Sequence, residues 1–149
     1  MNNEKLQVFV DGVTNYFETV SDEPVSVSTP FLISDINKYL SDYTGIIGIS
    51  GNQKGSVFFT APKGLLAHLL NDLGVLSTQE DKLMDLVGEV SNTISGNARR
   101  EFGDQFMLSV PVVLKGTSDQ IAVAKTVEIY VIPIVWRHLK SNVIINLES

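Results

Sequence analysis

The sequence contains no cysteine among its 149 residues, and its only histidines are His68 and His138. The lack of cysteine excludes disulfides, thiolate metal sites and cysteine nucleophiles. His68 lies in an apolar segment without an acidic partner at metal-ligand spacing, so we expect no zinc site there. The protein therefore has few of the side chains on which metal and redox chemistry depend.

A net positive charge and long apolar runs are also missing. The net charge of −6 argues against a nucleic-acid backbone or an anionic membrane as the main partner. No apolar run approaches the roughly 20 residues of a membrane-spanning helix, and the polar start Met1–Lys5 has no signal-peptide core. We expect a cytoplasmic protein that does not insert into membranes, folded as one domain over residues 1–149.

Two common catalytic motifs are absent as well. Lys54-Gly55-Ser56 is not a phosphate-binding P-loop, because the order Gly-Lys-Ser/Thr does not occur. Ser50 fails the spacing of a nucleophile elbow, because Asn52 occupies the position of the last glycine. The glycines around these residues are instead typical of a β-hairpin turn.

Hydrophobic periodicity predicts three helices. They cover residues 4–20, residues 62 to about 73, and about 25 residues that begin near 77 or 78 and stop at Gly103. Ser77 and Glu80 fit a capping box at the start of the third helix. Gly74 is a candidate C-cap for the second helix.

Strand signals fill most of the rest. They cover residues 25–33, a hairpin over 46–59, and residues 106–114, 127–136 and 143–147, whereas residues 35–40 are ambiguous. Pro111 and Pro133 interrupt two of these segments, which indicates edges or bulges. We predict an α/β (α+β) sandwich in which the helices pack on a mostly antiparallel sheet.

The third helix carries the most informative pattern. At 100° per residue, its apolar positions fall in one narrow sector. These positions are Leu83, Val87, Val90, Ile94 and Ala98. Asp85, Glu89, Asn92 and Gly96 fall on the opposite side, so we expect Glu89 and Asn92 to face solvent. Their spacing of three residues places the carboxylate and the carboxamide next to each other.

Two glycines inside this helix need an explanation. Gly88 and Gly96 each cost about 1 kcal/mol relative to alanine. Neither lies at the centre of the apolar stripe, and close approach by another backbone is the usual reason for such a glycine. Glu89 also lacks a cation four residues further on. An ordinary solvated helix surface is the alternative interpretation of the same residues.

This segment resembles the signature of the CheC/CheX/FliY family of chemotaxis phosphatases. In that signature an acidic residue precedes Glu-x-x-Asn, and a small residue or glycine follows four positions on. Here Asp85, Glu89-Val-Ser-Asn92 and Gly96 match it. The likeness extends over about residues 4–147, including the hairpin glycines and the segment 110–116. Within that segment Leu114-Lys115-Gly116 is more basic than the family's usual Ser-Gly.

The branch of the family follows from the number of sites. Members of the CheC and FliY branches resemble internal duplications and usually carry two Glu-x-x-Asn sites, whereas this chain has one. The single site makes it similar to CheX, which implies a homodimer with joined sheets.

The resemblance implies that the protein hydrolyses the aspartyl phosphate of a CheY-type response regulator. It implies no cofactor of the protein's own, with Mg²⁺ held by the phosphorylated receiver. Asn92 would orient the attacking water and Glu89 would pair with a receiver lysine. Asp85, Gly88 and Gly96 would contact the partner.

Two rival functions fit the same sequence. The same fold suits a non-catalytic module that only binds a phosphorylated receiver. It also suits a structural dimer that acts through its sheet edge, in which case the exposed polar pair has no role.

Overall fold

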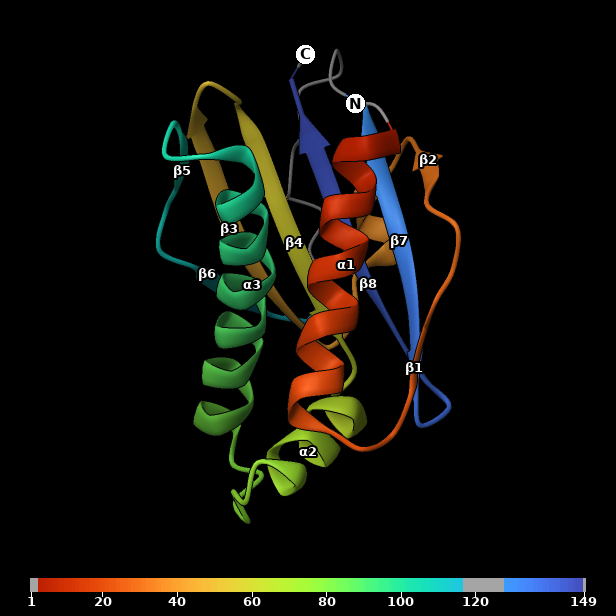
Figure 1. Cartoon of the computed structure of the whole chain (residues 1–149). Coiled ribbons are helices and arrows are strands. Elements are labelled where there is room, and N and C mark those ends of the chain that lie inside the picture. The colour runs from red at the N-terminus through yellow and green to blue at the C-terminus, as the bar shows by residue number, and fades with distance from the viewer. Residues whose placement is uncertain (1–2, 117–127, 149) are drawn as a thin grey trace.

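The computed structural model describes residues 3–116 and 128–148. In these residues three α-helices cover one face of an eight-stranded sheet (Figure 1). The elements are α1 (Asn3–Val20), β1 (Val25–Val27), β2 (Phe31–Ile33), the 3₁₀ helix η1 (Ile36–Tyr39), β3 (Tyr43–Gly51), β4 (Gly55–Ala61), α2 (Lys63–Asp72), α3 (Glu80–Phe102), β5 (Phe106–Leu108), β6 (Val112–Lys115), β7 (Ile129–Trp136) and β8 (Leu139–Leu147).

Every strand pairing in the sheet is antiparallel. The strand order is β1-β7-β8-β4-β3-β5, with β2 also on β7 and β6 also on β3. The predicted hairpin is confirmed as β3 and β4, whose register runs from Tyr43 opposite Ala61 to Ile49 opposite Gly55. The predicted fold class, helices packed on an antiparallel sheet, is confirmed.

The main core lies between the helices and the sheet. The predicted apolar stripe of α3 is buried throughout, and Leu83 is its most accessible member at 1%. Phe9, Val13 and Phe17 form the matching stripe of α1. Burying a large apolar side chain contributes about 1.5–3 kcal/mol, so these two stripes hold α1 and α3 side by side on the sheet (Figure 1).

The start of α3 differs from the prediction. The helix begins at Glu80 and has 23 residues, with Gln79 as an N-cap that makes no side-chain cap bond. The Ser77 hydroxyl oxygen accepts a hydrogen bond from the Gln79 N–H at 3.3 Å. The capping box is therefore wrong, because Ser77 stabilises a local turn two residues on instead of the helix end. Gly103 ends the helix as predicted, with φ of 95°.

Two predicted strands are each divided into two. The segment 25–33 forms β1 and β2, which both pair with β7. The segment 106–114 forms β5 and β6, which both pair with β3. In each case a proline, Pro30 or Pro111, lies in the break, because proline has no N–H to donate to a ladder.

Pro133 is not at an edge, which corrects that part of the prediction. It pairs with Asn142 of β8, and β7 has β1 and β2 on its other side. Pro133 falls in the gap between those two short strands, where its carbonyl accepts a hydrogen bond from the Ser28 N–H at 2.9 Å. Because Pro133 faces this gap, its lack of an N–H removes no hydrogen bond between strands.

One ambiguous segment, one shifted boundary and one untested boundary remain. The ambiguous segment 35–40 contains η1. The last strand begins at Leu139, four residues before the prediction. Residue 127, the predicted start of β7, lies outside the described residues.

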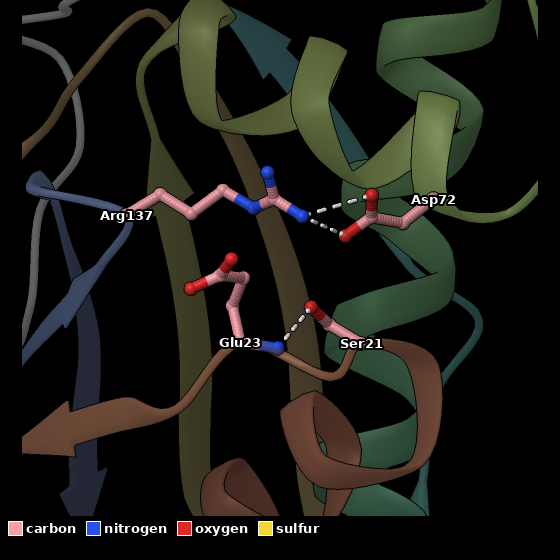
Figure 2. Close-up of polar contacts among 4 residues, drawn as sticks. All are labelled: Ser21, Glu23, Asp72 and Arg137. Atoms are coloured by element: carbon pink, nitrogen blue, oxygen red, sulfur yellow. Dashed lines mark hydrogen bonds and ion pairs between the residues drawn. The ribbon is translucent and has the colours of Figure 1, made fainter.

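A polar clamp joins the β7–β8 turn to the end of α2 (Figure 2). Arg137 and His138 form this turn with positive φ values of 52° and 64°. The Arg137 guanidinium donates to both carboxylate oxygens of Asp72, at 3.0 and 2.9 Å. It also lies 4.8 Å from the centre of the Trp136 ring. We call this the Asp72–Arg137 clamp.

Candidate functional site

The position of α3 on the sheet depends on a glycine in β3. A Cβ at Gly45 would collide with the Ser91 hydroxyl and would lie 2.9 Å from the Val87 carbonyl oxygen. The Ser91 hydroxyl donates to that same carbonyl oxygen at 2.8 Å. Because the backbone of β3 lies almost in contact with the backbone of α3, the helix has little freedom to shift across the sheet.

The outward face of α3 carries the predicted polar residues. Asp85, Glu89 and Asn92 are exposed, as expected from the helical spacing. Among the described residues, neither the Glu89 carboxylate nor the Asn92 carboxamide has a hydrogen bond or an ion pair within the chain. The backbone carbonyl of Glu89 accepts a bond from the Thr93 hydroxyl at 2.9 Å, which leaves the carboxylate available. A rigid helix thus presents two polar groups without internal partners.

These residues line an open groove of about 380 Å³. Its lining consists of Met84, Asp85, Gly88, Glu89, Asn92, Pro111 and Val113. We call it the α3–β6 groove, since α3 forms one wall and the segment around β6 forms the other. The second wall is apolar, whereas the wall from α3 carries both carboxylates and the carboxamide.

The two glycines of α3 have different surroundings. A Cβ at Gly88 would lie 3.4 Å from Val113 and 3.6 Å from Pro111, so this residue is packed against the second wall of the groove. A Cβ at Gly96 would meet nothing within 4 Å. Gly88 therefore brings the chain's own β6 close to the helix, and Gly96 leaves open space on the outward face.

Helix α1 lies on the other side of Glu89. Burial raises the pKa of Tyr16 on α1 to about 12, and the negative charge of Glu89 adds to the shift. Tyr16 is therefore protonated, and a hydrogen-bond donor, at neutral pH. The sequence prediction did not include this residue, because its aromatic side chain fits the apolar stripe of α1 equally well.

The basic residue that departs from the family pattern has a structural partner. The Lys115 ammonium of β6 lies 2.7 Å from the Glu80 carboxylate at the start of α3. The Tyr43 hydroxyl donates to the same carboxylate at 3.2 Å. The hydrogen bond from Lys115 lowers the pKa of Glu80. Lys115 thus ties β6 to α3 at one end of the α3–β6 groove.

Two features are absent from the part of the chain that the structure describes. It contains no cluster of three or more histidine, aspartate or glutamate side chains placed to hold a metal ion. It also contains no helix with the length and apolar character needed to cross a bilayer. His68 packs edge-on against Trp136, with 6.5 Å between the ring centres.

The sequence matches a known protein family over more than half of its length. Residues 43–135 match the family model described as chemotaxis phosphatase CheX. The chain belongs to the CheX family. This match includes β3, the whole of α3 and both walls of the α3–β6 groove. No curated protein sequence matches the chain significantly.

Solved structures of CheX and CheC-like proteins have the same fold. A chemotaxis protein CheX from Desulfovibrio desulfuricans is 28% identical with a TM-score of 0.84, over 97% of this chain and 99% of that one. A CheC-like superfamily protein from Shewanella sp. PV-4 is 26% identical with a TM-score of 0.85, over 100% of both chains. A chain of a CheX–CheY–BeF3–Mg²⁺ complex from Borrelia burgdorferi is 17% identical with a TM-score of 0.80, over 97% of this chain and 98% of that one.

Proposed function

We propose that the protein dephosphorylates a CheY-type response regulator by hydrolysing its aspartyl phosphate. Membership of a family of chemotaxis phosphatases supports the reaction class. The observation that carries the proposal is the exposed, unpartnered pair of Glu89 and Asn92 on a helix that is firmly placed. Polar groups with no internal partner are available to a second protein.

Asn92 orients the attacking water. An acyl phosphate already has a good leaving group, and a receiver supplies its own Mg²⁺, so the missing element is a water held in line with phosphorus. A carboxamide suits this task because it has both a donor and an acceptor and stays neutral. Glutamine orients water in the same way in GTPases.

Glu89 docks the helix against the receiver. A carboxylate one turn from Asn92 pairs with the lysine at the receiver's phosphorylation site and sets the register of insertion. The absence of an internal partner supports this role, because no ion pair must be broken first. Glu89 does not act as the base in this mechanism.

The remaining site residues assist contact. Asp85 and Gly88 line the α3–β6 groove that the receiver covers. Gly96 lets the receiver backbone approach α3, which is consistent with the open space beside it. In the Borrelia burgdorferi complex a CheX is bound to a CheY with BeF3 and Mg²⁺, which supports a receiver of this kind as the partner.

We also propose that the protein is a cytoplasmic homodimer with joined sheets. In the described residues, β1 and β2 form one sheet edge and β5 and β6 form the other, without a further strand beyond them. Unpaired strand edges are templates for pairing with another chain. Analytical ultracentrifugation of the purified protein is expected to give the mass of two chains, and a single-chain mass at all concentrations would contradict it.

Turnover tests the proposed function. Catalytic amounts of the protein are incubated with a panel of acetyl-phosphate-charged CheY-type receivers, and released phosphate is measured. We expect rapid release from at least one receiver, and loss of that release with Asn92→Ala. A protein that binds a phosphorylated receiver but slows or does not change its decay is a binding module, which would overturn the proposal.

A further inference from the structure

A second polar surface lies beside Glu89, on the seam between α1 and α3. The two helices pack side by side and run in opposite directions (Figure 1). At the seam, a Cβ on Gly12 of α1 would lie only 3.4 Å from the Ile94 carbonyl oxygen of α3. Because the backbones are this close, the side chains above them form two hollows that share Asn15, Asn97 and Arg100.

The hollow nearer to Glu89 contains no acidic residue. It has a volume of about 400 Å³ and is lined by Asn15, Tyr16, Thr19, Val20, Thr93, Asn97 and Arg100. We call it the acid-free hollow. The neighbouring hollow also contains Asp11 and Glu101, so the two halves of the seam differ in charge.

Arg100 provides the positive charge of the acid-free hollow. Its guanidinium is exposed and has no ion pair or hydrogen bond within the described residues. Neither Asp11 nor Glu101 pairs with it, and the Asp11 carboxylate accepts a bond from the Gln7 amide at 2.8 Å instead. The side chains of Asn15 and Asn97 likewise have no hydrogen-bond partner within the described residues. The hollow therefore combines one unpaired cation with neutral hydrogen-bond donors.

The spacing along α3 connects this hollow to the proposed site. Arg100 follows Glu89 by about three helical turns, or roughly 16 Å along the helix axis, and so lies on nearly the same side of the helix. Thr93, in the wall of the acid-free hollow, is one turn from Glu89. A protein that covers Glu89 and Asn92 from the outward face of α3 also reaches this hollow.

We infer that Arg100, with Asn15 and Asn97, forms a second docking point for the receiver of the proposed function, on which this inference rests. The docking point accepts an exposed carboxylate of the receiver within about 16 Å of the lysine that Glu89 contacts. A guanidinium flanked by amide donors matches a carboxylate in charge and in hydrogen-bond geometry. Glu89 binds a cation of the receiver and Arg100 binds an anion. The two contacts together fix the orientation of the receiver on α3.

Calorimetry tests this with a CheY-type receiver loaded with beryllofluoride and Mg²⁺. Arg100→Glu is expected to raise the Kd about tenfold, because it places like charges together. Arg100→Lys keeps the positive charge, so we expect it to raise the Kd by less than Arg100→Glu does. The exposed carboxylates of the receiver within about 16 Å of the lysine that Glu89 contacts are then replaced by lysine one at a time. One of these replacements is expected to restore the binding of Arg100→Glu. Circular dichroism establishes that each variant is folded.

Lys38→Glu is the matched control for net charge. Lys38 is exposed on η1, whose Ile36 packs with Phe58 and Val131 in a smaller buried cluster, separate from the main core under the helices. If Lys38→Glu weakens binding as much as Arg100→Glu, or if neither changes the Kd, the docking point is refuted. A wild-type protein that binds the receiver without turnover refutes the proposed function and leaves the Kd comparison to decide the docking point. A wild-type protein that binds no receiver overturns both.

Discussion

The Asp72–Arg137 clamp and the Glu89–Asn92 pair put polar side chains to opposite uses. In the clamp, the carboxylate and guanidinium bind each other through two hydrogen bonds, with 17% and 31% of their side chains exposed. On α3, the carboxylate and carboxamide are exposed and bind nothing in the described chain. Figure 2 shows that the partners in the clamp come from distant parts of the chain, the end of α2 and the β7–β8 turn.

The difference follows from what each pair does for the folded state. A polar group that is largely withdrawn from water must find a partner, or its desolvation destabilises the fold. A polar group left in water costs the fold almost nothing and is free to bind a second molecule. The clamp should therefore matter for stability and not for turnover, and the pair on α3 should show the reverse.

The largest expected effect is on activity. Asn92→Ala should reduce phosphate release by about a hundredfold or more, because the water loses its orienting group. The free energy of unfolding should change by less than about 0.5 kcal/mol, because the side chain is exposed and unpartnered. Stopped-flow phosphate release and urea unfolding measure the two quantities. A variant that loses activity only because it is less stable would remove the contrast with the clamp.

Gly45→Ala should affect both regions at once. The added methyl group meets the backbone of α3, so overpacking should destabilise the protein by about 2–3 kcal/mol. The fraction that remains folded should have a lower kcat, because α3 must shift and Asn92 moves with it. Gly64→Ala is the control, since the nearest atom to a Cβ there is 3.8 Å away. Equal behaviour of the two variants would show that α3 is not positioned by Gly45.

Asp72→Asn tests the Asp72–Arg137 clamp, where we expect a loss of stability without a loss of activity. It leaves the half-buried guanidinium of Arg137 without its anionic partner, which should lower the free energy of unfolding by about 1–2 kcal/mol. The values of kcat and KM for the receiver should stay unchanged, since the clamp is remote from α3's outward face. Urea unfolding and steady-state kinetics provide the test. A marked loss of kcat in a folded variant would mean that the clamp also serves the site.

The smallest effect is expected from Gly96→Ala. A Cβ at Gly96 meets nothing within 4 Å, so alanine should stabilise the helix by up to about 1 kcal/mol. The same methyl group should weaken binding of a beryllofluoride-loaded receiver, because it occupies the space left for the partner. Calorimetry and thermal unfolding are the measurements. Higher stability with unchanged affinity would remove Gly96 from the contact surface.

Local pattern was enough to predict much of the fold. The periodicity of α3 predicted its buried stripe, and the glycines around residues 51–55 predicted the β3–β4 hairpin. The start of α3 was missed, because Ser77 forms its hydrogen bond in a local turn, a choice between two similar bonds that the sequence does not distinguish. Pro133 was misplaced, because its acceptability depends on where two other strands end.

The sequence by itself determined that α3 has one apolar and one polar side, and hence that Glu89 and Asn92 face outward three residues apart. This is so because helical geometry depends on residue spacing alone. Only the tertiary structure decided that Pro111 and Val113 form the second wall of the groove, that Lys115 reaches Glu80, and that Arg100 stays unpaired beside α1. These features depend on contacts between segments far apart in the chain, which no local pattern encodes.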